Sequence, residues 1–169
     1  MLDNEKTYKY LNSFAKYIIQ QSKSNLTRQG KNVNKKLYNS LDKEIEVGAN
    51  SFRLAFLMED YGAYQDKGVS GTEKKYNTPF SYKTKRPPLK PITNWVSSKR
   101  IQFKKEDGKF MSYESTSYLI RNAIYRKGIK PSLFFTKPFE KAFERLPDEL
   151  VEAYGLDVEK FLQYTINKK

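Results

Sequence analysis

Apolar residues at helical spacing mark the first element of the chain. Four of them recur three, four and eight positions apart: Leu11, Phe14, Ile18 and Leu26. This spacing predicts an amphipathic helix over about residues 4–25. Gly30 is expected to end it, and the segment 33–41 to add a short helical turn with Leu37 and Leu41 pointing inward.

From Lys43 onward the pattern changes from helical to alternating. Ile45 and Val47 alternate with polar residues, and a second run places apolar residues at every other position: Phe52, Leu54, Phe56 and Met58. The turn-forming residues 48–50 lie between the two runs, so we predict a β-hairpin over about residues 43–59. One face of its second strand is wholly apolar, as in a sheet covered mainly on one side.

The middle of the chain combines one long irregular segment with two predicted helices. Residues 61–66 are predicted to form one helical turn, and the long segment 69–90 that follows carries Gly71 and three prolines (Pro79, Pro87 and Pro88). A compact domain seldom leaves more than twenty residues without structure, so we expect this arm to be functional or ordered by a partner, and mobile in isolation. A helix is predicted from Pro91, and another over about residues 112–127.

Trp95 and Val96 belong to the first of these two helices, at spacings that predict its buried side. The indole could stack on a nucleic-acid base, but a core position is the more usual reading of this spacing.

Two stretches flank the middle of the chain: 58–71 and 128–139. We predict that they form the closing corner of one small domain, because three aromatic residues after Pro131 are placed to point back to a core: Phe134, Phe135 and Phe139. Two short helices are predicted to follow, over about residues 138–146 and 151–166. The chain as a whole (1–169) is thus predicted to be a single α+β domain, a small antiparallel sheet on amphipathic helices, with residues 147–169 as a carboxyl-terminal helical tail.

The residue types restrict the chemistry. The chain has no cysteine and no histidine, which removes disulfides, thiolate zinc sites and the usual catalytic base. The amino terminus shows no signal-peptide pattern and no stretch approaches membrane-spanning length, so we expect no membrane and synthesis in a cytoplasm. An enzyme would have to work with carboxylates, lysines and tyrosines alone, and we expect no cofactor.

Positive charge is concentrated in the middle of the chain. The formal net charge is +13, and residues 60–130 hold 16 lysines and arginines against 6 acidic residues, an excess of +10. A localised basic surface often faces a polyanion, although a merely solvated face is the alternative. Ten basic residues are therefore candidates for contact with DNA or an acidic partner: Lys74, Lys75, Lys83, Lys85, Arg86, Lys99, Arg100, Lys104, Lys105 and Lys109.

One enzymatic pattern remains as a more remote alternative. Asp60 or Asp66 with Glu73 and Lys75 could hold a divalent metal ion for phosphodiester cleavage. Glu73 lies in a loop with no strand before it, so a solvated loop glutamate is the simpler interpretation. The segment Gly68–Thr72 lacks the ending of a phosphate-binding loop and is interpreted as a turn.

The order of short motifs resembles a known family. A Leu-x-x-Ser-Leu step at 37–41, Tyr-Gly-Ala-Tyr at 61–64, Asp-Lys-Gly at 66–68, the Trp95 helix, and the run from Gly128 through Pro131 and Phe134 to Pro138 follow one another. This order, over about residues 8–146, resembles the tail-completion or neck proteins of tailed bacteriophages. The long segment 69–90 and the acidic carboxyl tail depart from that pattern.

The resemblance implies a non-catalytic α+β subunit that forms a homo-oligomeric ring in the head-to-tail connector. Its expected partners are the portal or adjacent neck and tail ring proteins, with non-specific contact to passing DNA, and its expected location is the virion. The arm would then contact a neighbouring subunit or ring through Tyr76, Phe80, Tyr82, Pro87 and Pro88. A non-catalytic nucleic-acid-binding accessory protein is the alternative, and which ring the chain would form stays open.

Overall fold

A computed structural model describes residues 5–48, 51–146, 148–155 and 157. Contacts group the chain into two compact units. Unit 1 comprises residues up to Asp60 and from Phe134 onward, and unit 2 is Tyr61–Leu133. The prediction of a single domain stays a prediction, because contact grouping does not tell whether the units fold separately.

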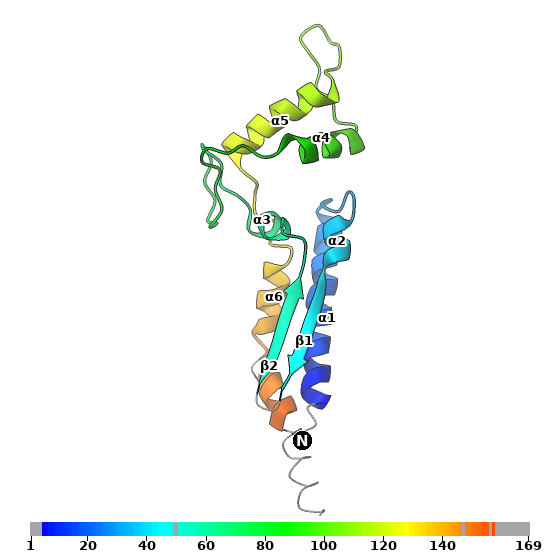
Figure 1. Cartoon of the computed structure of the whole chain (residues 1–169), viewed down its shortest axis with the longest axis vertical. Coiled ribbons are helices and arrows are strands. Elements are labelled where there is room, and N and C mark those ends of the chain that lie inside the picture. The colour runs from blue at the N-terminus through cyan, green and yellow to red at the C-terminus, as the bar shows by residue number, and fades with distance from the viewer. Residues whose placement is uncertain (1–4, 49–50, 147, 156, 158–169) are drawn as a thin grey trace, which may run out of the picture. The chain divides into compact units, whose positions relative to one another are not determined.

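Unit 1 is built on one long helix, α1 (Glu5–Arg28), which packs beside a β-hairpin and a later helix (Figure 1). The short helix α2 (Lys36–Ser40) leads into β1 (Asp42–Val47), which pairs antiparallel with β2 (Phe52–Leu57). The helix α6 (Thr136–Phe143) follows unit 2 in the chain, and residues 148–155 are helical. An α+β fold with a small antiparallel sheet is therefore confirmed.

The predicted apolar stripe of α1 is buried. Leu11, Phe14, Ile18 and Leu26 are all among the buried residues. The hairpin register pairs Ile45 with Leu54 and Val47 with Phe52, which places the apolar side chains of both strands on one face. The apolar stripe of the long helix and the apolar face of the hairpin thus cover each other. The sequence predicts both surfaces, the first from helical spacing and the second from alternating spacing.

Phe134 closes the core of unit 1. Its side chain has no exposed surface and packs with Leu26, Leu37 and Leu41. Phe135 and Phe139 both contact the ring of Phe56 edge-on, at centroid distances of 5.1 and 6.0 Å. The three phenylalanines predicted to point back to a core therefore do so.

Unit 2 contains α3 (Gly62–Lys67), α4 (Leu89–Ser98) and α5 (Tyr113–Lys127), and α4 packs along α5. The prediction that Trp95 is a core residue is wrong: Val96 is fully buried, but 41% of Trp95 is exposed. In α5 the buried residues are the small Thr116 and Ser117. Neighbouring residues of a helix point about 100° apart, so the side chain next to the fully buried Val96 lies at the edge of the buried face.

The second predicted carboxyl-terminal helix is described only in part. Residues 148–155 and Asp157 are helical, and the rest of the predicted span beyond residue 157 lies outside the described residues. The tail is joined to the first helix of the chain, because Tyr10 donates a hydrogen bond from its hydroxyl to Glu149. Burial and the nearby Glu149 carboxylate raise the pKa of Tyr10.

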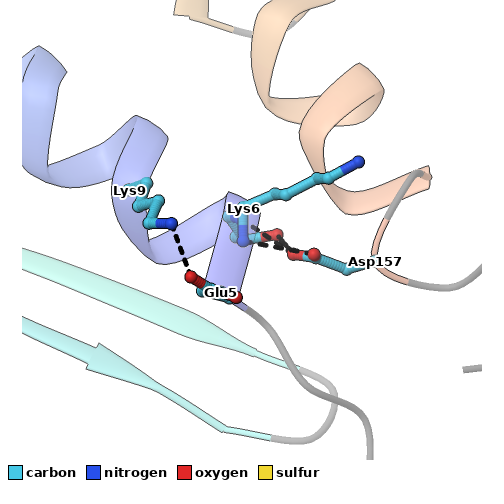
Figure 2. A network of polar contacts seen from close by, with 5 residues as sticks. Glu5, Lys6, Lys9 and Asp157 are labelled. Carbon is cyan, nitrogen blue, oxygen red and sulfur yellow. Dashed lines mark hydrogen bonds and ion pairs between the residues drawn. The ribbon is translucent and has the colours of Figure 1, made fainter. Parts of the chain in front are cut away.

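Asp157 caps the amino terminus of α1 from the other end of the chain (Figure 2). Its carboxylate accepts hydrogen bonds from the backbone N–H groups of Lys6 (3.1 Å) and Thr7 (2.8 Å), and from the Thr7 hydroxyl (2.7 Å). These N–H groups have no partner inside the helix, and the helix dipole favours a negative charge there. Burial by itself raises the pKa of Asp157, but the hydrogen bonds from Thr7 and Lys6 outweigh it and the pKa is lowered.

We expect Asp157→Asn to reduce the free energy of unfolding by about 1–2 kcal/mol at neutral pH, because a charged cap becomes a neutral one. A group with a lowered folded-state pKa stabilises the fold above its unfolded pKa, near pH 4, and loses this effect as pH falls through its folded pKa. Urea unfolding followed by circular dichroism should therefore give a constant deficit from about pH 5 to pH 8 that shrinks below about pH 4. The exposed Asp60→Asn is the matched control, and an equal loss in both variants would contradict the cap.

Candidate functional site

Two segments of unit 2, one that precedes α4 and one that follows α5, meet in a backbone corner. Val69 and Ile129 exchange two backbone hydrogen bonds of 2.9 and 2.8 Å as an antiparallel bridge. The N–H groups of Ser132 and Leu133 both donate to the carbonyl oxygen of Asp66, at 3.0 and 2.9 Å. The two stretches predicted to form a corner therefore do pair, although some sixty residues separate them.

Three glycines allow the two backbones to come this close. A Cβ atom on Gly71 would lie 2.0 Å from the carbonyl oxygen of Arg126, and one on Gly128 would lie 2.2 Å from that of Val69. At Gly68 a Cβ would meet the carbonyl oxygen of Ile129 at 2.5 Å. Any larger residue would have to push the segments apart, so the corner requires glycine for space as well as for conformation.

The arm 69–90 is bound to its own chain. Thr72 donates its N–H to the carbonyl oxygen of Tyr125, while Glu73 and Lys74 both donate to that of Arg126. The last carbonyl oxygens of a helix lack hydrogen-bond donors within the helix, and here the N–H groups of the arm are those donors. The sequence predicts that the arm is functional or ordered by a partner, and mobile in isolation. The structure instead gives it hydrogen-bond partners at the end of α5 in its own chain, and a function of the arm stays a prediction.

Aromatic residues of the arm also pack within unit 2. Phe80 contacts the ring of Tyr64 at 4.5 Å, and Tyr82 contacts that of Tyr125 at 6.2 Å. Both arm residues are half-buried, and burial raises the pKa of Tyr82. Phe80 and Tyr82, predicted to contact a neighbouring subunit, therefore already have partners inside their own unit.

The other three predicted contact residues of the arm differ in exposure. Tyr76 is half-buried, with its N–H bonded to the Ser70 hydroxyl, and Lys74 lies over its ring. Pro87 is buried and its carbonyl oxygen accepts a 2.8 Å hydrogen bond from Arg121, whereas Pro88 is exposed. Contact with another subunit by these five residues stays a prediction.

The predicted basic residues divide into two groups at opposite ends of α5. One group, here called the carboxyl-end patch, consists of exposed residues from the arm and the last turn of the helix: Lys74, Lys75, Lys83, Lys85, Arg86, Arg126 and Lys127. The amino-end patch lies in the connection between α4 and α5: Lys99, Arg100, Lys104, Lys105 and Lys109. A 15-residue helix is about 22 Å long, so the ten candidates cannot act as one compact site.

Contacts within the carboxyl-end patch hold several cations in place. The Arg86 guanidinium lies over the Tyr125 ring at 5.5 Å, and Lys75 donates to the carbonyl oxygen of Gly71 at 2.8 Å. Arg126 lies 3.7 Å from Glu73, and both side chains are more than half exposed. Sequence reasoning missed Arg126 as a surface cation, because its place at a helix end has a purely local explanation.

The amino-end patch is carried by a tight turn. Lys104 and Phe110 form an antiparallel bridge, and the N–H of Lys105 donates to the carbonyl oxygen of Lys109. The ring of Phe110 is 62% exposed, with the Lys104 ammonium 5.4 Å from its centre. An exposed aromatic ring among cations is a common feature of surfaces that bind nucleic acid, and the sequence interpretation did not single out this ring.

The carboxylates proposed for a nuclease have other surroundings. Glu73 faces Arg126, and Asp66 is buried. Within the part of the chain that the structure describes, no three acidic residues lie close enough together to hold a metal ion. The nuclease stays the more remote alternative.

Comparison with protein-family models, with curated proteins and with solved structures gave no match to this chain. None of the described helices combines the length and the apolar character needed to cross a membrane.

Gly128 and Gly108 allow the crowding at the corner to be tested against a matched control. Both have positive φ, +75° and +78°, but only Gly128 faces backbone where a Cβ would lie, since nothing lies within 4 Å of that position at Gly108. We expect Gly108→Ala to cost about 1–2 kcal/mol from backbone strain alone, and Gly128→Ala to cost clearly more. Chemical unfolding of both variants measures the difference, and equal costs would contradict the close contact.

Proposed function

We propose that this chain is a structural subunit of a ring in the head-to-tail connector of a tailed bacteriophage. On this proposal it has no catalytic role, lies in the neck or tail of the virion, and joins the portal side to the tail while DNA passes. Its partners are copies of itself and the portal or adjacent ring proteins.

The observation that carries the proposal is the glycine corner of unit 2. The resemblance to neck proteins rests on the order of short motifs, and two of these, Asp66–Gly68 and the run from Gly128 through Pro131, meet at this corner. A Cβ at Gly68 would lie 2.7 Å from the Pro131 ring. Motifs far apart in sequence that form one contact in space are better explained as parts of a single architecture than as chance matches.

The charge distribution supports a division of labour between the units. Unit 2 holds 16 lysines and arginines against 5 acidic residues, a formal charge of +11, which leaves +2 for unit 1. A ring could use the nearly neutral unit for assembly and the basic unit to face DNA or an acidic portal surface. Contacts with DNA would be diffuse and screened by salt, because a ring that held DNA tightly would obstruct its passage.

Electron microscopy of the purified full-length chain, with its molar mass from light scattering, tests this proposal. We expect rings with a central channel and a mass that is a multiple of the 19.9 kDa protomer. Mass spectrometry of purified virions should detect the chain. A protein that stays monomeric at all concentrations and is absent from virions would overturn the proposal.

A nucleic-acid-binding accessory protein is the second candidate, favoured by the two basic patches of unit 2. Both patches place cations next to tyrosine or phenylalanine rings. Lysine and arginine side chains without a helix of a known reading type contact the phosphate backbone rather than base sequence.

For this candidate we expect alanine at Lys83, Lys85 and Arg86 to weaken duplex DNA binding equally for all sequences. The slope of log affinity against log salt should become shallower by about 0.9 for each phosphate that the variant no longer neutralises. A second variant with alanine at Lys104, Lys105 and Lys109 tests the amino-end patch, and alanine at Lys137 and Lys141 of α6 is the control in unit 1. Unchanged affinity and slope in both patch variants would rule out DNA binding by these residues.

A further inference from the structure

Unit 1 carries a basic groove with an apolar floor. The groove has a volume of about 750 Å³ and is bounded by α1, by the end of α2 and by the start of β1. Four cations border it (Lys16, Lys23, Arg28 and Lys43) together with one carboxylate, Asp42, and its apolar residues are Ile19, Tyr38 and Leu41. This lining carries a formal charge of +3 and suits an acidic segment that also has apolar side chains.

The geometry of α1 explains why the groove has this character. Lys16, Ile19 and Lys23 lie three and four positions apart, so they share one face of the helix beside the buried stripe. The Lys23 ammonium lies 5.1 Å from the centre of the Tyr38 ring, and Lys43 donates a hydrogen bond to Asn12. These contacts position two of the four cations at the groove.

A second surface of unit 1 has the complementary character. Residues 148–157 contain four acidic residues and no lysine or arginine. Asp148, Val151 and Glu152 are all exposed, and Val151 and Glu152 follow Asp148 by three and four positions along a helix, which places them next to it on one face. Val151 is 72% exposed, the highest value among the exposed large apolar residues of the described chain.

This acidic face is held away from the groove of its own chain. Glu149 and Asp157 attach the segment near the amino end of α1, at Tyr10, Lys6 and Thr7, and Tyr154 contacts Phe52 at the start of β2. The groove is lined by α1 from Lys16 onward and by residues 38–43. The two surfaces therefore belong to different sides of unit 1, so the face of one copy can enter the groove of another.

We propose that the helical face formed by Asp148, Val151 and Glu152 docks in the groove between α1 and β1 of a second copy of this chain. In this contact Val151 lies on the apolar floor, and the two carboxylates pair with the lysines at the rim. The contact joins two different surfaces, so it is head-to-tail, and repeating it closes a ring when the rotation per subunit divides a full turn. The inference rests on the proposed ring function, for which it names the interface.

Charge reversal tests the interface on the full-length chain. We expect Lys16→Glu with Lys23→Glu, and separately Asp148→Lys with Glu152→Lys, to raise the dissociation constant of the oligomer by about 100-fold, because like charges then face each other. The chain with all four substitutions should assemble again, and so should an equimolar mixture of the two double variants. Lys137→Glu with Lys141→Glu on α6 is the control and should leave assembly unchanged.

Light scattering measures assembly and circular dichroism checks that each variant is folded. Rings that persist in both double variants would overturn the interface while leaving the ring function standing, whereas a wild type that stays monomeric and is absent from virions would overturn both. The interface would also be overturned if both double variants lost assembly and neither their mixture nor the fourfold variant recovered it. If the groove variant stays assembled but loses affinity for DNA, the groove binds phosphate and the docking proposal is wrong.

Discussion

The close backbone contact between residues 68–71 and 126–133 is the constraint on which unit 2 depends. It exists because Gly68, Gly71 and Gly128 have no Cβ where the other segment's carbonyl oxygens lie. Once the segments touch, the arm completes the hydrogen bonds of the α5 carboxyl end, and Tyr82 and Arg86 come to lie against Tyr125. The carboxyl-end patch is therefore assembled by a contact that contains no charge.

Unit 1 depends on an equally remote connection, between the first turn of α1 and the carboxyl-terminal segment. Asp157 satisfies backbone donors at the start of α1, and Phe134 fills the space beside Leu26 and Leu41. In the same carboxyl-terminal segment, Asp148 and Glu152 are exposed.

The two units differ in how their charges are arranged. The formal charge of +11 belongs to unit 2, whereas unit 1 combines a basic groove and an acidic face that nearly cancel. Opposite charges on two sides of one unit favour contact between copies, and an unbalanced charge favours a polyanion. The proposed interface between copies and the alternative of DNA binding both rest on this difference between the units.

The sequence alone determined three features: the apolar stripe of α1, the hairpin with its apolar face, and the phenylalanines after Pro131 that point towards the core. These follow from side-chain spacing, which depends only on neighbours along the chain. It also predicted that the two glycine-bearing stretches form one corner, because the aromatic residues after Pro131 are placed to point back to a core. Only the tertiary structure decided that the arm is bonded to α5, that Trp95 is exposed, and that the basic residues form two patches and a separate groove. Those features depend on which carbonyls and faces a distant segment meets, and spacing along the sequence carries no information about that.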